Sequence, residues 1–265
     1  MSLRGIALCA LLLLCSGVAA EVTVDDFEAG TFTDSQGTAI HYRLFVPRGY
    51  DASAAATYPL VAFLHGNGDQ GSDNRRQVRE GARVWAEPAN QARYPAFVLA
   101  PQCPADDGWG RPAGLAGYPD GSPLEALFEL LDDVERRYRI DRDRRYITGM
   151  SGGGWGTLRA LSHQPQRFAA AILVCPAGEP AKNPEVPLRE NGVGVVAGIE
   201  SIPLWFFHGT DDPVVPISLS RDRVAALRRA GGSPRLTEYS GVRHDAWVKA
   251  YAEPAIVDWL FGHRR

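Results

Sequence analysis

The chain has 265 residues, of which 45% are hydrophobic and 22% charged, and its formal net charge at pH 7 is -3. One α/β domain with a single core can fill this length. The composition excludes both an intrinsically disordered chain and a small disulfide-rich protein. Because the charge is slightly negative and the arginines are scattered, there is no basic face for nucleic acid. We therefore expect a globular protein without a nucleic-acid partner.

The first twenty residues have the pattern of a secretory signal peptide. Arg4 supplies a positive start, residues 6–14 are almost entirely apolar, and Val18-Ala19-Ala20 places small residues at a cleavage site. The apolar run is too short for a membrane span, and no other segment approaches the required length of about 20 residues. We expect cleavage after Ala20, a secreted or periplasmic mature protein, and no membrane span.

The four cysteines fall into two groups. Cys9 and Cys15 lie in the expected signal peptide, and Leu14 disfavours a lipid anchor at Cys15 because such a signal requires a small residue there. Cys103 and Cys175 each follow an apolar strand-like run, and an oxidising compartment would permit a disulfide between them. We favour two half-buried thiols, and the bridge stays open as the alternative.

Strand patterns recur along the chain. Residues 31–33 and 41–46 flank the turn Asp34-Ser35-Gln36-Gly37 and predict a β-hairpin. Short apolar runs bounded by turn residues then predict parallel strands that are covered on both faces. These runs cover residues 60–64, 96–100, 146–150, 169–174 and 204–207, and a last strand is expected over 235–239.

Two helices are indicated by apolar spacing and end signals. Ser122 is a candidate N-cap before Pro123, and Glu125 completes a capping box ahead of apolar residues at helical spacing. A second helix is expected over residues 218–230. Strands alternating with helices predict one α/β domain over residues 21–265, with helices on both faces of a mostly parallel sheet and the antiparallel hairpin at one edge.

A long irregular segment, residues 176–201, is rich in glycine and proline. It is equally consistent with a wall of the substrate site and with a plain connection. It is the only sizeable insertion that the patterns show. We therefore expect an open, shallow site that tolerates bulky substrates.

The chemistry centres on Gly149-Met150-Ser151-Gly152-Gly153. This G-x-S-x-G pattern follows a predicted strand and opens a predicted helix over residues 155–161, which is the context of a nucleophile elbow. Glycines are required because a side chain beside the serine would collide with the adjacent strand or helix. The hydroxyl would lie at a helix N-terminus, where unpaired N–H groups favour negative charge. The pattern predicts that Ser151 is a nucleophile.

A serine nucleophile requires a base and an orienting carboxylate, which follow it in the chain in this kind of fold. Four histidines follow Ser151. His163 lies in the helix behind the serine and His263 lies at the end of the chain, so both are expected at the surface. His208 and His244, each beyond a predicted strand, are the remaining candidates.

Three motifs in combination resemble the α/β-hydrolase superfamily. They are Gly149 to Gly153, His208-Gly209-x-x-Asp212-Pro213 and His244-Asp245-x-Trp247. The loops Leu64-His65-Gly66-Asn67-Gly68-Asp69 and Ala100-Pro101-Gln102-Cys103-Pro104 resemble in particular its secreted esterase branch. That branch contains predicted peptidases, polyhydroxybutyrate depolymerase-like proteins, and feruloyl or acetylxylan esterases. The resemblance spans about residues 40–260.

The resemblance implies a Ser-His-Asp triad. Ser151 would be the nucleophile, His244 the general base and then acid, and Asp212 the carboxylate that orients the imidazole. Asp211 competes for the last role and is disfavoured because Asp212 holds the position before the proline. Asp245 is expected to cap the helix that begins after His244.

Backbone amides are expected to bind the oxyanion. One is the N–H of Gly152, the residue after the nucleophile, and the other comes from the loop after the first parallel strand. In that loop we prefer the N–H of Asn67 to that of either neighbouring glycine. His65 and His208 each precede a glycine at a strand end and are expected to brace loops.

Tryptophans near the motifs bear on the substrate site. Trp155 and Trp247 are expected to pack in the interior. The residues around Trp109 show no regular spacing of apolar side chains, so Trp109 is the candidate wall of the substrate pocket. There its indole could stack on a phenolic group or a sugar.

The resemblance implies a serine hydrolase that cleaves carboxylic esters through an acyl-enzyme, with no cofactor and no metal. The expected partner is a small-molecule or polymer ester, such as feruloyl or acetyl esters of plant polysaccharide or polyhydroxyalkanoate-type esters. A single-domain serine peptidase and a non-catalytic binding protein remain alternatives. The glycines of residues 192–197 are disfavoured as a dinucleotide site because no strand precedes them.

Overall fold

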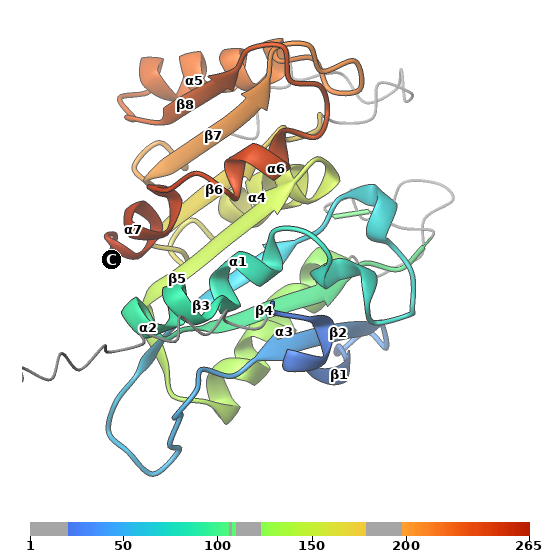
Figure 1. The fold of residues 1–265 in the computed structure, drawn as a ribbon, viewed down its shortest axis with the longest axis vertical. Helices are drawn as coiled ribbons and strands as arrows, with labels where there is room; N and C mark the ends of the chain where they lie inside the picture. Colours follow the sequence, from blue (N-terminus) through green and yellow to red (C-terminus); the bar gives the residue numbers. More distant parts are fainter. Residues whose placement is uncertain (1–20, 106–107, 110–122, 179–197) are drawn as a thin grey trace, which may run out of the picture.

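One eight-stranded sheet organises the chain (Figure 1). The computed structural model describes residues 21–105, 108–109, 123–178 and 198–265. The strand order is β1-β2-β4-β3-β5-β6-β7-β8. β1 (Glu28–Thr33) pairs antiparallel with β2 (Ala39–Phe45), β2 pairs antiparallel with β4, and the later pairs are parallel. The predicted mostly parallel sheet with a hairpin at its edge is confirmed.

The parallel strands lie on the predicted apolar runs. They are β3 (Tyr58–Leu64), β4 (Phe97–Gln102), β5 (Ile140–Met150), β6 (Ala170–Val174), β7 (Leu204–Gly209) and β8 (Arg235–Tyr239). β5 begins at Ile140 rather than at Tyr146, because the charged residues 141–145 conceal its first half. These strands end at one edge of the sheet, so the segments that follow them are brought together.

Alternate residues of the central strands enter two buried layers on opposite faces of the sheet. In β3, Leu60, Ala62 and Leu64 belong to one layer, whereas Val61 and Phe63 belong to the other. The first layer contains buried residues of α3 (Pro123–Arg137), α4 (Gly152–His163) and α5 (Ser218–Arg229). The second contains those of α1 (Ala82–Ala86), α6 (Ala246–Ala250) and α7 (Ile256–Phe261).

The longer helices match their predictions. α3 begins at Pro123 and α5 covers all but the last residue of the expected range, while the proposed cap Ser122 lies outside the described residues. α1, α7 and α2 (Pro88–Arg93) were not predicted, because segments this short do not show a period of 3.6 residues. Short 3-10 helices also occur: η1 (Val24–Asp26), η2 (Asn67–Asp69) and η3 (Arg76–Val78).

No disulfide joins Cys103 and Cys175. Cys103 packs in the layer that contains α3 and α4, whereas Cys175 packs in the layer that contains α6 and α7, so the sheet lies between them. Both residues are fully buried. The preferred alternative of two separate thiols is therefore correct, but the expectation of half-buried side chains is wrong.

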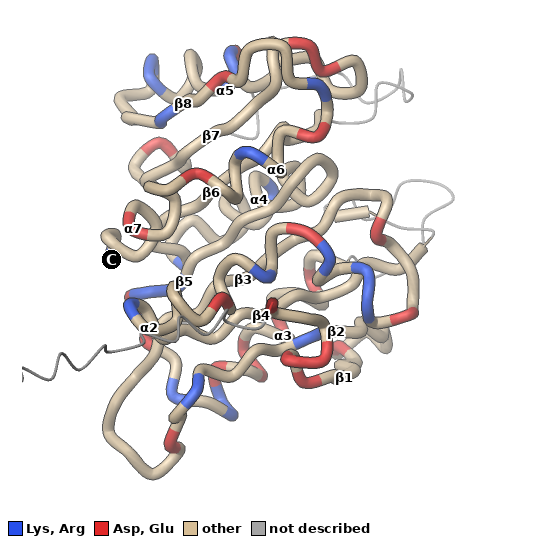
Figure 2. The backbone as a smooth tube through the Cα atoms, viewed as in Figure 1, with Lys and Arg blue, Asp and Glu red and all other residues tan. Residues whose placement is uncertain are grey.

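Charged residues of both signs are interspersed along the described chain (Figure 2). None of its described helices combines the length and the apolar character that a membrane crossing requires.

Candidate active site

Ser151 occupies the sharp turn between β5 and α4. Its backbone angles, φ 53° and ψ -117°, lie where a residue with a side chain is strained. Hydrogen bonds to neighbouring segments hold this conformation. The Ser151 N–H donates to the carbonyl of Val174 at 2.9 Å, and the N–H of Ala177 donates to the Ser151 carbonyl at 3.0 Å. The end of β6 and the segment after it therefore fix the turn that presents the hydroxyl.

The glycines around the serine make room for this turn. A Cβ built on Gly149 would lie 2.3 Å from the carbonyl oxygen of Gly153 in α4, and one built on Gly153 would lie 2.0 Å from the carbonyl oxygen of Leu64 in β3. Displacement of these backbone atoms would cost free energy, because they belong to the strand and the helix themselves. The predicted reason for the glycines, collision with the adjacent strand and helix, is confirmed.

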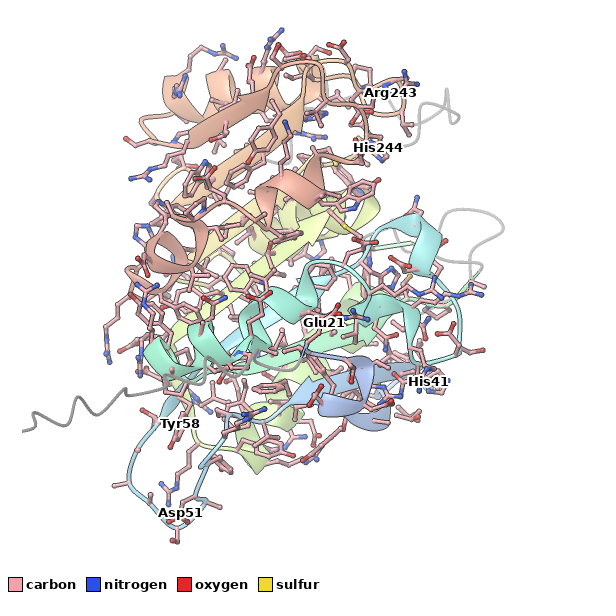
Figure 3. All side chains as sticks on the ribbon, in the orientation of Figure 1. Glu21, His41, Asp51, Tyr58, Arg243 and His244 are labelled. Atoms are coloured by element: carbon pink, nitrogen blue, oxygen red, sulfur yellow. The ribbon has the colours of Figure 1, made fainter. Side chains whose placement is uncertain are left out.

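His244 lies between Ser151 and Asp212. Its Nε2 is 2.9 Å from the Oγ of Ser151, and its Nδ1 is 2.7 Å from Oδ2 of Asp212. A carboxylate only accepts, so Nδ1 carries the proton and Nε2 accepts from the serine hydroxyl. The side chain of His244 is 20% exposed, and it follows Arg243 on the loop after β8 (Figure 3). This arrangement can take the serine proton and hold it.

Asp212 is buried just after β7 and remains ionised. Burial opposes ionisation, but the hydrogen bond from His244 and those from the N–H groups of Val215 and Val214, both at 2.9 Å, outweigh it and lower the pKa of Asp212. The exposed Asp211 instead accepts from the hydroxyl of Thr210 at 2.7 Å. The structure thus brings Asp212, and not Asp211, to the imidazole.

Asp245 stands at the N-cap position of α6 without capping it. Its side chain makes no capping hydrogen bond, so that expectation is wrong although the helix begins where predicted. The carbonyl of Asp245, rather than its side chain, bonds the first turn and accepts the N–H of Val248 at 3.0 Å.

The other two strand-end histidines brace loops, as predicted. His65 donates from Nδ1 to the carbonyl of Gly66 at 2.7 Å and accepts the N–H of Cys103 at Nε2 at 2.9 Å. His208 donates from Nε2 to the carbonyl of Val215 at 2.9 Å and accepts the hydroxyl of Ser220 at Nδ1. Burial lowers the pKa of His65 to about 4 and also lowers that of His208, so both rings stay neutral.

The loop after β3 lies against the serine turn. A Cβ built on Gly66 would be 3.6 Å from the Cβ of Ser151, and one built on Gly152 would be 2.0 Å from Oδ1 of Asn67. Asn67 and Gly152 are the first residues of η2 and α4, where backbone N–H groups have no partner within the helix. The two expected oxyanion donors therefore come from segments that are in contact beside Ser151.

Trp109 is a core residue and not a pocket wall. Its side chain is 2% exposed, its indole N–H donates to the carbonyl of His65 at 3.1 Å, and its ring packs edge-on against the His65 imidazole. The expectation for Trp109 is therefore wrong, because the absence of apolar periodicity does not exclude burial. The half-buried Trp247 packs edge-on against His244, and Trp155 is buried as predicted.

Cys175 lies next to His244, a position that the sequence did not reveal. Its Sγ is 3.6 Å from the carbonyl of His244, and burial raises the pKa of the thiol to about 12. The potential metal-ligand atoms of Cys175, Asp212 and His244 lie within 4.8 Å of one another. Among the described residues, no other three histidines, cysteines or acidic residues form such a group. They fit a metal poorly, because metals bind thiolate whereas burial favours the protonated thiol, and because the Asp212 carboxylate and the His244 imidazole already bond each other.

Arg223 of α5 is a second residue whose position near the site could not be predicted from the sequence patterns. Its guanidinium is buried, donates to the carbonyls of Pro176 and Ala177 at 2.8 Å each, and lies over the indole of Trp155. It therefore anchors the start of the irregular segment 176–201, of which residues 179–197 lie outside the described part. A charged residue on a helix is expected at the surface, so the sequence carried no signal for this role.

A family model and a solved structure match most of this chain. The model of the family named Esterase, described as "Putative esterase", matches residues 33–228. A solved structure, "Crystal Structure of a Thermostable Esterase", is 40% identical with a TM-score of 0.79 and covers 92% of this chain and 64% of that chain.

Two curated relatives are more distant. "Putative esterase NocK" of Nocardia uniformis subsp. tsuyamanensis is 29% identical over 208 residues, which are 72% of this chain and 57% of the relative. "Probable feruloyl esterase C" of Aspergillus terreus is 29% identical over 178 residues, or 66% of this chain and 56% of the relative. The chain thus spans less than two thirds of the length of each of these three proteins.

Proposed function

The chain belongs to the Esterase family of α/β-hydrolases, and on that premise we propose that it is a serine hydrolase that cleaves carboxylic esters through an acyl-enzyme. The observation that carries the proposal is the continuous hydrogen-bonded series from Ser151 through His244 to Asp212. A nucleophile, a base in contact with it and a group that orients the base are what acyl transfer requires.

Acylation begins at the Ser151 hydroxyl. Its Oγ attacks the ester carbonyl carbon while the hydroxyl proton moves to Nε2 of His244, and the carbonyl electrons form an oxyanion. The ionised Asp212 stabilises the imidazolium that results. When the tetrahedral intermediate collapses, the bond to the alcohol oxygen breaks and His244 gives its proton to the departing alcohol. The acyl group is then bonded to Ser151.

Deacylation repeats these steps with water. His244 takes a proton from water, whose oxygen attacks the acyl carbon. Collapse of the second intermediate breaks the bond to Oγ, returns the proton to Ser151 and releases the carboxylic acid. In both intermediates the N–H groups of Gly152 and Asn67 donate to the oxyanion, a contribution of the kind that is worth about 10²–10³ in turnover per donor.

We base the proposed substrate class on the names of the relatives. One of them is named a feruloyl esterase, and we propose that the ester substrate is a feruloyl or acetyl ester of plant polysaccharide or a polyhydroxyalkanoate-type ester. The half-buried Trp247 beside His244 offers an aromatic surface near the reacting atoms and takes the place that the sequence suggested for Trp109.

Replacement of the nucleophile tests the reaction. Ser151→Ala should abolish turnover of nitrophenyl acetate and labelling by a fluorophosphonate probe, while its thermal unfolding stays close to that of the parent. A Ser151→Ala protein that still hydrolyses the ester would refute the proposal. Methyl ferulate, acetylated xylan and an aminoacyl amide, assayed with the active enzyme, separate the proposed substrates from those of a peptidase.

The N-terminal signal pattern leads us to propose that the protein is exported. Mass spectrometry of the protein recovered outside the cytoplasm should find Glu21 at its N-terminus. Recovery only as the full-length cytoplasmic chain would refute export.

A further inference from the structure

Gln102 is a buried residue at the end of β4. The three hydrogen bonds of its side chain go to residues 66–74, the segment that follows β3, which we call the oxyanion loop. Oε1 of Gln102 accepts the N–H of Asn74 at 2.7 Å. Its Nε2 donates to the carbonyl of Asp69 at 3.0 Å and to Oδ1 of Asp73 at 2.9 Å. Gln102 is 1% exposed, so water does not compete for these bonds.

The far end of the oxyanion loop is held by the edge hairpin. Arg43 of β2 donates from Nε to the carbonyl of Asn74 at 2.7 Å, and Nδ2 of Asn74 donates to the carbonyl of Gly30 in β1 at 3.2 Å. Asn74 adopts φ 51°, a left-handed conformation that needs such support.

The near end is held through the residue next to Gln102. The N–H of Cys103 donates to Nε2 of His65, whose Nδ1 donates to the carbonyl of Gly66, and the carbonyl of Cys103 accepts the N–H of Gly71 at 2.9 Å. The backbone of Cys103 and the side chain of Gln102 together therefore hold the oxyanion loop from its first residue to its last.

We propose that Gln102 is a positioning residue that fixes the oxyanion loop so that the N–H of Asn67 meets the developing oxyanion. This inference rests on the proposed function. An oxyanion exists only in the transition state and its intermediates, so displacement of its donor lowers kcat and leaves KM nearly unchanged. A misplacement of about 1 Å is enough to cost about 10²-fold in rate.

The chain offers a matched control in Gln91 of α2, whose side chain bonds to Ala96 just before β4. It too is a buried glutamine with three hydrogen bonds: Nε2 donates to the carbonyls of Trp85 and Ala96, and Oε1 accepts the N–H of Ala96. Gln91→Met and Gln102→Met remove the same number of bonds at similar burial. Only Gln102 touches the oxyanion loop.

The variants should separate on three measurements. With a nitrophenyl ester, Gln102→Met should lower kcat about 10- to 100-fold with KM within about twofold, whereas Gln91→Met should keep kcat within about twofold. A trifluoromethyl ketone, which forms an oxyanion adduct with the serine, should bind Gln102→Met more weakly by a similar factor. Amide hydrogen exchange over residues 66–74 should rise in Gln102→Met and stay unchanged in Gln91→Met.

Gln102→Glu supplies a second variant if the methionine protein does not fold. It keeps the acceptor for Asn74 and replaces the two donors with an oxygen that faces Asp69 and Asp73, so the same three effects are expected. Equal losses of kcat in the Gln91 and Gln102 variants, or unchanged kcat and exchange in the Gln102 variants, would overturn the proposal. If Ser151→Ala instead keeps full activity, the proposed function fails, and the exchange comparison still decides whether Gln102 holds the loop.

Discussion

Nδ1 of His244 lies 2.7 Å from Oδ2 of Asp212, and the side chain that receives this bond has no exposed surface. The same carboxylate also accepts two backbone N–H groups, which keep it ionised and fixed in orientation. An amide in its place could still accept those bonds, but it could neither stabilise the imidazolium nor enforce the tautomer that leaves Nε2 free for Ser151. The main effect of the bond is therefore to set which nitrogen of His244 carries the proton.

Asp212→Asn should lower kcat for a nitrophenyl ester by about 10⁴ with little change in folding. Asp211→Asn is the matched control, because Asp211 is exposed and, within the part of the chain that the structure describes, its carboxylate bonds only to the Thr210 hydroxyl. It should stay within a few-fold of the parent enzyme. A larger loss in Asp211→Asn than in Asp212→Asn would transfer the orienting role to Asp211.

Gly153→Ala should prevent the serine turn from forming correctly. The added Cβ would lie 2.0 Å from the carbonyl oxygen of Leu64 and 2.5 Å from that of His65, both backbone atoms of the strand end beside it. Overpacking of this kind typically costs about 1–3 kcal/mol, and here it also displaces the serine. We expect a lower urea midpoint and little ester turnover.

The control for this variant is Gly68→Ala, because a Cβ there meets no atom within 4 Å. Gly68 lies in the oxyanion loop next to Asn67, so the control also tests whether any added methyl group near the site is harmful. Equal midpoints and equal activities for the two variants would contradict the explanation for the glycine.

The contact of Ser151, His244 and Asp212 could be predicted because each residue stands in a short local pattern. A glycine-rich turn after a strand, an aspartate before a proline and a histidine beyond the last strand are recognisable without any knowledge of their contacts. Parallel strands bring their carboxyl ends to one edge, so local patterns alone were enough to predict that Ser151, Asp212 and His244 meet.

Residues that act through long-range packing could not be predicted in this way. Gln102 and Arg223 each bond a segment far away in the sequence, and neither glutamine at a strand end nor arginine in a helix signals burial. Trp109 was assigned wrongly for the same reason, since its partner His65 is distant in the chain. Short helices such as α1 and α7 could not be predicted, because five or six residues are too few to show helical periodicity.

The two cysteines should remain thiols when the protein is kept in an oxidising buffer. The sheet separates Cys103 from Cys175, and burial raises the pKa of the Cys175 thiol to about 12, so almost no reactive thiolate is present. Differential alkylation with peptide mapping should label both residues only after unfolding. A mapped peptide pair linked through these two residues, or rapid labelling of Cys175 in the native protein, would contradict this.

His65 makes stability depend on pH in a defined window. Its ring is fully buried, both of its nitrogens are hydrogen-bonded in the neutral form, and burial lowers the folded pKa to about 4. The unfolded chain binds a proton near the ordinary pKa of about 6.5. Between those values the unfolded state holds more protons, so the free energy of unfolding falls as the pH falls, by about 3 kcal/mol in total from this residue.

His65→Gln removes the titrating group and should flatten this dependence. The variant should be less stable at pH 7, because glutamine cannot reproduce both bonds, yet its urea-derived free energy of unfolding should fall by about 3 kcal/mol less than that of the parent between pH 7 and pH 4. Burial also lowers the pKa of His163, His208 and His263, but these residues are present in both proteins, so their contributions cancel in the comparison. Parallel pH profiles for the two proteins would show that His65 takes up its proton in the folded state at an ordinary pKa.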